Sequence, residues 1–278
     1  MKILAFGEVL WDVYPDSRHI GGAVMNFSAH AARLGADVYF ASSVGDDEDG
    51  HAAMKLMAQW GINTEHVTIS HTFETGKCLV TLDADNIPAY DLLQNVAYDH
   101  IPLPAGDFDV LCFGTLSQRD DPNLTTLRKL LKHDYREIFA DINIRPPFFT
   151  EESISLCLEN ATILKISDEE LHYVSTTRDV KLAAEAIMQK YKNLKLVIIT
   201  LGEKGAAVYD GVRYYRQDCI KTVVKSTVGA GDSFSAAFLV KYLNGADITE
   251  CLETAIRLSS FVVSRQAAVP EYDCKEYL

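Results

Sequence analysis

Short apolar runs alternate with amphipathic segments along most of the chain. The apolar runs predict buried strands, and the segments with apolar residues three and four positions apart predict helices that cover them. The predicted strands are 3–6, 38–42, 110–113, 137–141, 163–166 and 196–200. The predicted helices are 26–34, 50–60, 123–132, 151–159, one that begins at Asp168, 180–190, 233–243 and 248–265. This alternation indicates an α/β fold with a doubly wound, mainly parallel sheet, in which ligands bind at the carboxyl ends of strands.

Two segments depart from this alternation. Residues 77–82 alternate like a strand and 89–93 resemble another, with no convincing helix between 75 and 101. Their polar connections predict a small antiparallel flap beside the main sheet. Residues 206–209 and 212–215 resemble a hairpin around Asp210-Gly211.

Composition narrows the class of protein. Apolar residues make up 48% of the 278 residues and charged residues 23%, which are ordinary globular values and argue against disorder. The net charge of −13 argues against nucleic acid or an anionic membrane as a partner, and no apolar run is long enough to span a bilayer. The six cysteines are scattered, which argues against a disulfide framework or a zinc site and predicts reduced thiols in a cytoplasmic protein.

The strongest chemical signal is the turn Gly229-Ala230-Gly231 before Asp232, which opens an apolar helix. Small residues let a backbone turn approach a ligand closely, and the amides at a helix N-terminus favour an anion. Asp232 is placed to accept a proton from a hydroxyl that attacks a phosphate. The alternative is a plain strand-to-helix turn with an Asp near its N-terminus.

Two further patterns lie near the N-terminus. Gly21-Gly22 precedes a helix that carries Asn26, whose amide suits a hydroxylated ligand; the alternative is that Asn26 caps the helix. Glu8 and Asp12 follow the first strand and can accept sugar hydroxyls; the alternative is that both are solvated loop acids.

Three patterns follow later strands. Thr200, Gly202 and Gly205 suit backbone contact with nucleotide phosphates, or else form the approach to a hairpin. Residues 141–145 place polar groups at another strand end. Ser167 and Glu170 do the same, although this pair also fits a capping box, with Ser167 as N-cap and Glu170 three residues later.

Taken together, these motifs resemble the ribokinase (PfkB) family of carbohydrate kinases. The resemblance runs from Gly7 to about Ala268, with two separated signatures in the family's order. The positions that carry it are Gly21, Gly22, Asn26, Ser28, Gly35 and Gly45, then Thr200, Gly202 and Gly205, then residues 227–232. Residues 7–12 and the Asp-x-Asn-x-Arg-Pro pattern that begins at Asp141 look most like the fructokinase branch, and 2-keto-3-deoxygluconate kinases share the second pattern.

The resemblance implies one three-layer α/β/α kinase domain over residues 1–278, with a small β-sheet lid from about 10–20 and 75–100. It also implies a role for each matched position. Asp232 would be the catalytic base, and Gly229, Ala230 and Gly231 would form an anion hole, with Arg145 near the phosphates. The remaining positions divide between the sugar (Asp12, Gly22 and Asn26), the nucleotide (Thr200, Gly202, Gly205, Ser167 and Ser264) and Mg²⁺ held through water (Glu170).

This sequence departs from the family pattern at several positions. Ser226 stands where the family usually has an Asp that contributes to a monovalent-cation site, which puts K⁺ activation in question. Ser167 replaces the Asn of an Asn-x-x-Glu motif. Ala267-Ala268 and Ile256 differ from the usual residues near the adenine, so the resemblance does not predict the adenine contacts.

The resemblance therefore implies ATP-dependent phosphorylation of a small sugar, with fructose as the leading substrate and ATP and Mg²⁺ as cofactors. The alternatives are a kinase for 2-keto-3-deoxygluconate, ribose or a nucleoside, and a catalytically silent sugar- or nucleotide-binding protein on the same fold. The expected partners are the sugar and ATP, with a homodimer through the lid as a further expectation.

Overall fold

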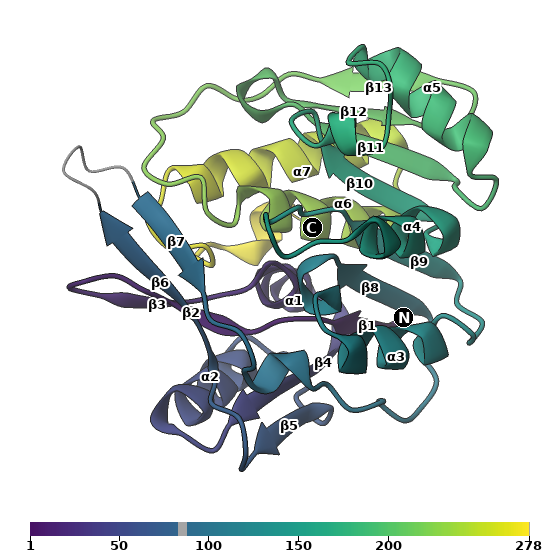
Figure 1. Ribbon diagram of the computed structural model, residues 1–278. Helices are drawn as coiled ribbons and strands as arrows, with labels where there is room; N and C mark the ends of the chain where they lie inside the picture. Colours follow the sequence, from purple (N-terminus) through teal and green to yellow (C-terminus); the bar gives the residue numbers. More distant parts are fainter. Residues whose placement is uncertain (83–87, 278) are drawn as a thin grey trace.

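The computed structural model describes residues 1–82 and 88–277. Its centre is a sheet with the strand order β13-β12-β11-β10-β9-β8-β1-β4-β5 (Figure 1). The strands are β1 (Lys2–Phe6), β4 (Asp37–Gly45), β5 (Val67–Ser70), β8 (Val110–Gly114), β9 (Glu137–Asp141), β10 (Ile163–Ser167), β11 (Leu196–Thr200), β12 (Ala206–Tyr209) and β13 (Tyr214–Gln217). From β5 to β11 every neighbouring pair is parallel, and the β12–β13 hairpin adds two antiparallel strands at one edge. The mainly parallel sheet and the hairpin at 210–211 are thus confirmed.

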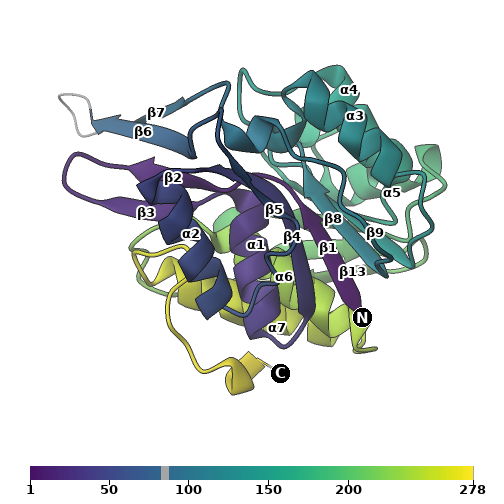
Figure 2. The ribbon, with the colours of Figure 1, turned by 90° about the horizontal axis from the view of Figure 1, so that it is seen from below.

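Helices cover both faces of this sheet (Figure 2). On one face lie α1 (Ala23–Arg33), α2 (Glu48–Gln59), α6 (Ala230–Leu243) and α7 (Ile248–Val263). On the other lie α3 (Asp121–Leu130), α4 (Glu151–Asn160) and α5 (Val180–Lys190). The predicted three-layer α/β/α architecture is therefore confirmed.

The first strand shows how the chain builds two cores. Ile3 and Ala5 of β1 pack into the core under α1 and α6, while Leu4 and Phe6 pack into the opposite core. Successive side chains of a strand point to opposite faces, so a strand covered on both faces must be apolar throughout. This is why the predicted strands read as continuous apolar runs.

A second sheet, called the small sheet below, projects from the body (Figure 1). It has the strand order β3-β2-β6-β7, formed by β2 (Leu10–Val13), β3 (Arg18–Gly21), β6 (Gly76–Leu82) and β7 (Pro88–Leu92). The strands expected at 77–82 and 89–93 are present, but the sheet is not wholly antiparallel, because β2 and β6 pair in parallel. Part of the expected range 75–100, residues 83–87, lies outside the described residues.

The helix expected to begin at Asp168 is wrong. After β10 the chain forms only a short 3₁₀ turn, η3 (Leu171–Tyr173). The N–H of Asp168 donates to Thr200 O of the next strand at 2.9 Å, and the Glu170 carboxylate accepts the N–H of Ser167. The segment is therefore held against the sheet edge by these bonds, which an α-helix starting at Asp168 would not make.

The other 3₁₀ turns are η1 (Ala97–Asp99), η2 (Leu116–Gln118), η4 (Gly202–Lys204) and η5 (Cys274–Tyr277). All six cysteines are free. Within 1–82 and 88–277, no helix combines the length and apolar character needed to cross a bilayer.

Candidate active site

Asn26 and Asp232 meet at the centre of the site. Asn26 Nδ2 donates a hydrogen bond to Asp232 Oδ2 at 2.8 Å, across 206 positions of sequence. Asn26 lies in the first turns of α1 and Asp232 in the first turn of α6, and these two helices pack against each other. The sequence motifs around Asn26 and Asp232 therefore belong to one site.

The Asp232 carboxyl titrates near neutrality. Loss of water raises its pKa to about 7, and the hydrogen bond from Asn26 opposes that rise. Asp141 also raises this pKa, while Lys165 lowers it. A carboxylate with such a pKa is matched to accepting a proton at neutral pH.

The turn before Asp232 requires glycine at its first position. Gly229 has a φ of +80°, and a Cβ there would lie 2.7 Å from the carbonyl oxygen of Ala268. Helix α6 begins at Ala230, whose N–H donates to Thr227 O at 3.3 Å. The first N–H groups of an α-helix have no partners within the helix, so the N-terminus of α6 is a place where an anion can bind.

The Glu8 side chain caps the N-terminus of helix α1, although Glu8 itself lies outside the helix. Its Oε1 accepts the N–H groups of Ala23 at 2.8 Å and Val24 at 3.4 Å, and the residue is 1% exposed. Gly22 is the N-cap, with a φ of +106°, and a Cβ there would lie 2.6 Å from Glu8 O. Asn26 therefore does not cap α1, and Glu8 is not a solvated loop acid. Burial raises the pKa of Glu8, while these backbone hydrogen bonds oppose the rise.

Asp12 lies in the small sheet, on strand β2. It pairs in register with Cys78 of β6, and a Cβ on Gly21 would lie 2.6 Å from Asp12 Oδ2. Burial raises the pKa of Asp12 to about 6, while His19, Cys78 and Arg145 act against the rise. The Asp12 carboxylate is thus half-buried, and the positive charge of Arg145 lowers its pKa.

Glu170 joins the ends of two neighbouring strands. Its Oε1 accepts the N–H of Ile144 at 2.7 Å, beyond β9. Its Oε2 accepts the N–H and the hydroxyl of Ser167, at 3.0 and 2.8 Å, at the end of β10. Only half of the expected capping box forms, because the N–H of Glu170 donates to the Ser167 carbonyl and not to the Ser167 hydroxyl, and only a 3₁₀ turn follows.

The predicted nucleotide residues lie along the same carboxyl edge. Thr200 ends β11 in register with Ser167 of β10. Gly202 is exposed with a φ of +56°. Gly205 has a φ of +91°, and a Cβ there would lie 1.9 Å from Gln217 O, so backbone conformation and close strand approach both account for this glycine. No hydrogen bond between described residues joins these three to Asp232.

Ser264 ends helix α7 and has local partners. Its hydroxyl donates to Phe261 O at 2.6 Å and accepts from Arg265 at 2.8 Å. Nearby, the N–H groups of Lys225 and Ser226 donate to Val263 O. These bonds hold the end of α7 against the segment that leads into the 229–231 turn.

Lys165 begins the strand-end pattern 165–170, but neither that pattern nor the family resemblance gives it a role. Its Nζ lies 2.8 Å from Asp141 Oδ1, and the residue is only 6% exposed. The available signal was a lysine within the apolar run 163–166. A buried charge in a strand requires a partner, but the sequence does not say which residue supplies it.

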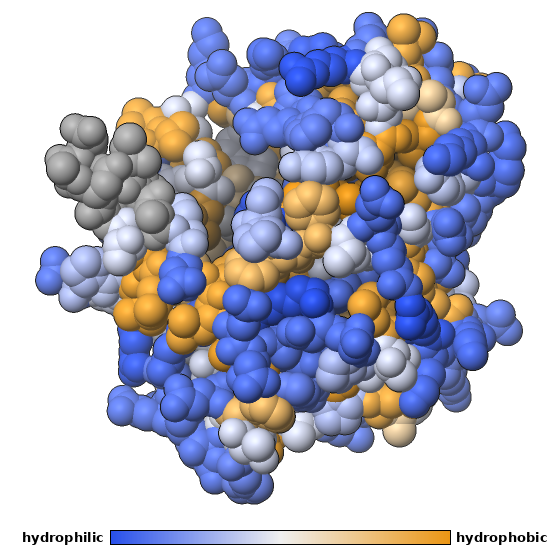
Figure 3. All heavy atoms as spheres, in the orientation of Figure 1, coloured by the Kyte–Doolittle hydropathy of each residue, from blue (hydrophilic) through white to orange (hydrophobic). Residues whose placement is uncertain are grey.

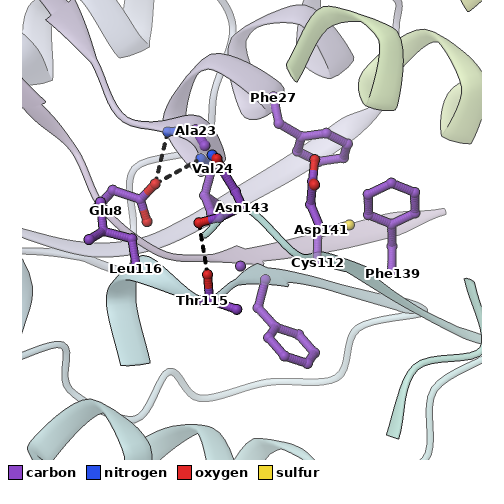
Figure 4. Close-up of a pocket in the computed structure, with 12 residues that line it drawn as sticks. Glu8, Ala23, Val24, Phe27, Cys112, Thr115, Leu116, Phe139, Asp141 and Asn143 are labelled. Atoms are coloured by element: carbon purple, nitrogen blue, oxygen red, sulfur yellow. Dashed lines mark hydrogen bonds between the residues drawn. The ribbon is translucent and has the colours of Figure 1, made fainter. Parts of the chain in front are cut away.

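A pocket lies between the end of β1 and the start of α1 (Figure 4). Glu8, Thr115, Asp141 and Asn143 are its polar lining residues, and Thr115 donates to Asn143 O at 2.9 Å. Phe27 and Phe139 line the apolar side. In the space-filling view the molecule is hollowed beside the small sheet (Figure 3). Asp12, Asn26 and Asp232 are not among the residues that line this pocket.

The chain resembles known proteins over almost its whole length. The family described as "pfkB family carbohydrate kinase" matches residues 4–272. A relative named probable fructokinase-4, from Arabidopsis thaliana, is 27% identical over 302 aligned residues, covering 96% of this chain and 92% of that protein.

Two solved structures show the same fold. A double mutant of the fructokinase of Vibrio cholerae O395, bound to fructose, ADP and a potassium ion, has a TM-score of 0.88 at 18% identity, covering 100% of this chain and 98% of the other. Aminoimidazole riboside kinase of Salmonella enterica, with its riboside and an ATP analogue, has a TM-score of 0.83 at 20% identity, covering 100% and 99%.

Proposed function

The chain belongs to the pfkB family of carbohydrate kinases, and from this premise we propose that it transfers the γ-phosphoryl group of ATP to a hydroxyl of fructose. The Asn26–Asp232 hydrogen bond carries the proposal, because it sets a carboxylate of suitable pKa at the N-terminus of α6. Fructose is the substrate named for the Arabidopsis relative and the sugar bound to the Vibrio neighbour.

In this proposal Asp232 is the base. Its carboxylate accepts the proton of the sugar hydroxyl as that oxygen attacks phosphorus, which is the role of a positioned carboxylate in phosphoryl transfer. Asn26 holds the carboxylate by donating to Oδ2, so the other oxygen can face the substrate.

We assign the sugar to Asp12, Gly22 and Asn26. Asp12 offers a half-buried carboxylate as an acceptor for hydroxyls, and Asn26 Oδ1 is buried without a hydrogen-bond partner among the described residues. Gly22 is assigned with them because it starts α1 beside Glu8, where a Cβ would lie 2.6 Å from Glu8 O.

The N-terminus of α6 suits the phosphates of a nucleotide, because its backbone N–H groups are hydrogen-bond donors. Gly229, Ala230 and Gly231 would direct backbone amides at the transferred phosphoryl group, although the N–H of Ala230 must leave Thr227 O to do so. Arg145 would add positive charge. We assign the remaining ATP contacts to the residues predicted for them, which are Thr200, Gly202, Gly205, Ser167 and Ser264.

Mg²⁺ would neutralise phosphate charge when bound with ATP. Both oxygens of Glu170 already accept protein hydrogen bonds, so Glu170 fits a metal through water and not as a direct ligand. Ser226 supplies a hydroxyl where a carboxylate is usual, and this hydroxyl accepts the N–H of Val228 at 3.2 Å. We therefore propose Mg²⁺ dependence, with K⁺ dependence tested separately.

The small sheet is proposed to act as a lid. It carries Asp12, and closure over the sugar would exclude water that could otherwise accept the phosphoryl group. The single kinase domain over 1–278 and association of two copies through this sheet stay predictions.

The test is ADP release from Mg-ATP with fructose, ribose, 2-keto-3-deoxygluconate, glucose, mannose and adenosine, each with and without K⁺. We expect strong turnover on fructose, and a loss of about 10²–10⁴-fold in kcat for Asp232→Asn. Turnover on another sugar and not on fructose would contradict fructose as the substrate but not the proposed phosphoryl transfer. Thermal stabilisation by ATP without turnover on any acceptor would favour a binding protein and contradict the proposal.

A further inference from the structure

A buried ion pair lies beneath the proposed catalytic turn. Lys165 of β10 and Asp141 of β9 are register partners on neighbouring parallel strands, so their side chains leave the sheet on the same face. Nζ and Oδ1 are 2.8 Å apart, and Lys165 is almost completely buried. Asp141 points toward the α1 side of the sheet, near Phe27 (Figure 4).

This pair contacts the first turns of α6 from below. Ser235 Oγ donates to Asp141 Oδ2 at 3.1 Å, one turn after the start of the helix. A Cβ on Gly231 would lie 3.2 Å from Lys165 Nζ, so the ammonium group sits directly beside the backbone of the turn. Asn26 holds Asp232 from the α1 side, and the ion pair supports the same helical turn from the sheet side.

The charges that face Asp232 come from several elements. Asp141 on β9 raises its pKa and Lys165 on β10 lowers it, while Glu8, after β1, raises it further. Asn26 on α1 acts through its hydrogen bond. Glu170, after β10, acts on the ion pair itself, because it raises the pKa of both Asp141 and Lys165.

We propose that Lys165, paired with Asp141, is a positioning residue for phosphoryl transfer. It anchors the first turn of α6 from beneath and balances the negative charge that surrounds Asp232 and the 229–231 turn. Removing only one member of a buried pair leaves an uncompensated charge, so the two members should act on Asp232 in opposite directions. This inference rests on the proposed role of Asp232 as base.

A second ion pair on the same strand supplies a control. Lys195 Nζ lies 2.8 Å from Glu137 Oε1, at the opposite end of β9 from Asp141. It is also a lysine–carboxylate pair on β9, but the Lys195 side chain is 51% exposed, and neither residue is among the charges that shift the pKa of Asp232. Lys195→Met therefore controls for the loss of a lysine and of an ion pair from β9 at a site away from Asp232.

The experiment is a carboxyl ¹³C titration of aspartate-labelled full-length protein. The Asp232 signal is assigned from Asp232→Asn and then followed in the wild type, Lys165→Met, Asp141→Asn and Lys195→Met. We expect Asp232 to titrate at a lower pH in Asp141→Asn than in Lys165→Met, by roughly one pH unit, with Lys195→Met superimposed on the wild type. If Lys165→Met does not fold, the inference is tested by Asp141→Asn alone. In that variant Asp232 must titrate at a lower pH than in the wild type.

Turnover provides the second measurement. Lys165→Met should lose about tenfold or more in kcat, with KM for sugar and ATP within about threefold, and Lys165→Arg should recover part of the loss. Identical titration of Asp232 in Asp141→Asn, Lys165→Met and the wild type would overturn the inference. The titration needs no substrate, so a wild type that phosphorylates no sugar would contradict the proposed function while the titration still tests the ion pair.

Discussion

Glu8 accepts the N–H of Ala23 at 2.8 Å, so a carboxylate that follows the first strand starts the helix that carries Asn26. Between this strand and this helix the chain forms the β2–β3 hairpin of the small sheet. The hydrogen bond from Ala23 to Glu8 joins the two ends of this connection. Glu8 therefore fixes the start of α1, while packing against α6 and the sheet holds the rest of the helix.

Glu8→Ala should lower the free energy of unfolding by about 2–3 kcal/mol, because it leaves buried N–H groups of α1 unpaired and opens a void. Glu8→Gln keeps an oxygen acceptor of the same shape, so we expect a loss within about 1 kcal/mol. Urea unfolding of both variants measures the difference. Equal losses would show that the acceptor at Oε1 does not hold α1.

Asp232→Asn should stabilise the folded protein above pH 7. The folded pKa, about 7, lies above the ordinary aspartate value of 3.8, so the unfolded chain releases its proton first as the pH rises. The free energy of unfolding of the wild type therefore decreases as the pH rises from about 4 to about 7. The variant has no carboxyl proton at this position, so it does not show this decrease. Melting temperatures from pH 4 to pH 8.5 test this. An advantage of Asp232→Asn that does not grow with pH would contradict the assigned direction.

Asp12→Asn should weaken sugar binding about tenfold or more and leave ATP binding within about twofold, because a charged acceptor for hydroxyls is lost. In the wild type, sugar affinity should fall as the pH drops below about 6, where Asp12 gains a proton. Asp12→Asn should lack this dependence.

Asp16, exposed in the turn of the same β2–β3 hairpin, offers a matched control. Asp16→Asn should bind sugar like the wild type. Calorimetric titration with each ligand separates the cases, and an equal loss of sugar and ATP affinity in Asp12→Asn would contradict the sugar assignment.

Gly229→Ala should lower the free energy of unfolding by more than backbone strain alone would. Gly229 and Gly245 lie just before and just after α6, with φ of +80° and +89°, so alanine is strained at both. Only at Gly229 does the added Cβ meet another backbone, 2.7 Å from Ala268 O.

We expect Gly245→Ala to lose about 1–2 kcal/mol of stability and keep its kcat. Gly229→Ala should lose more stability and at least about tenfold in kcat, because the turn beside Asp232 must shift. Thermal unfolding and steady-state kinetics of both variants measure this. Equal behaviour would mean that the Ala268 contact has no role.

The local pattern of the sequence determined most of the elements. The strands 137–141 and 196–200 and the helix 180–190 have the predicted bounds, because each depends on spacing within a few residues. The Gly-Ala-Gly-Asp turn was predictable for the same reason, since it needs only small residues ahead of a helix. The two family signatures were also readable as ordered local motifs.

Only the tertiary structure decided which of these motifs meet. Asn26 and Asp232 are brought together by the packing of α1 on α6, and Lys165 finds Asp141 through the pairing of β10 with β9. The same cause removes the helix expected at Asp168, whose N–H bonds to the neighbouring strand. Periodicity reports which face of an element is apolar, but burial, partners and pKa values depend on residues that are distant in sequence, and these are set by strand order and helix packing.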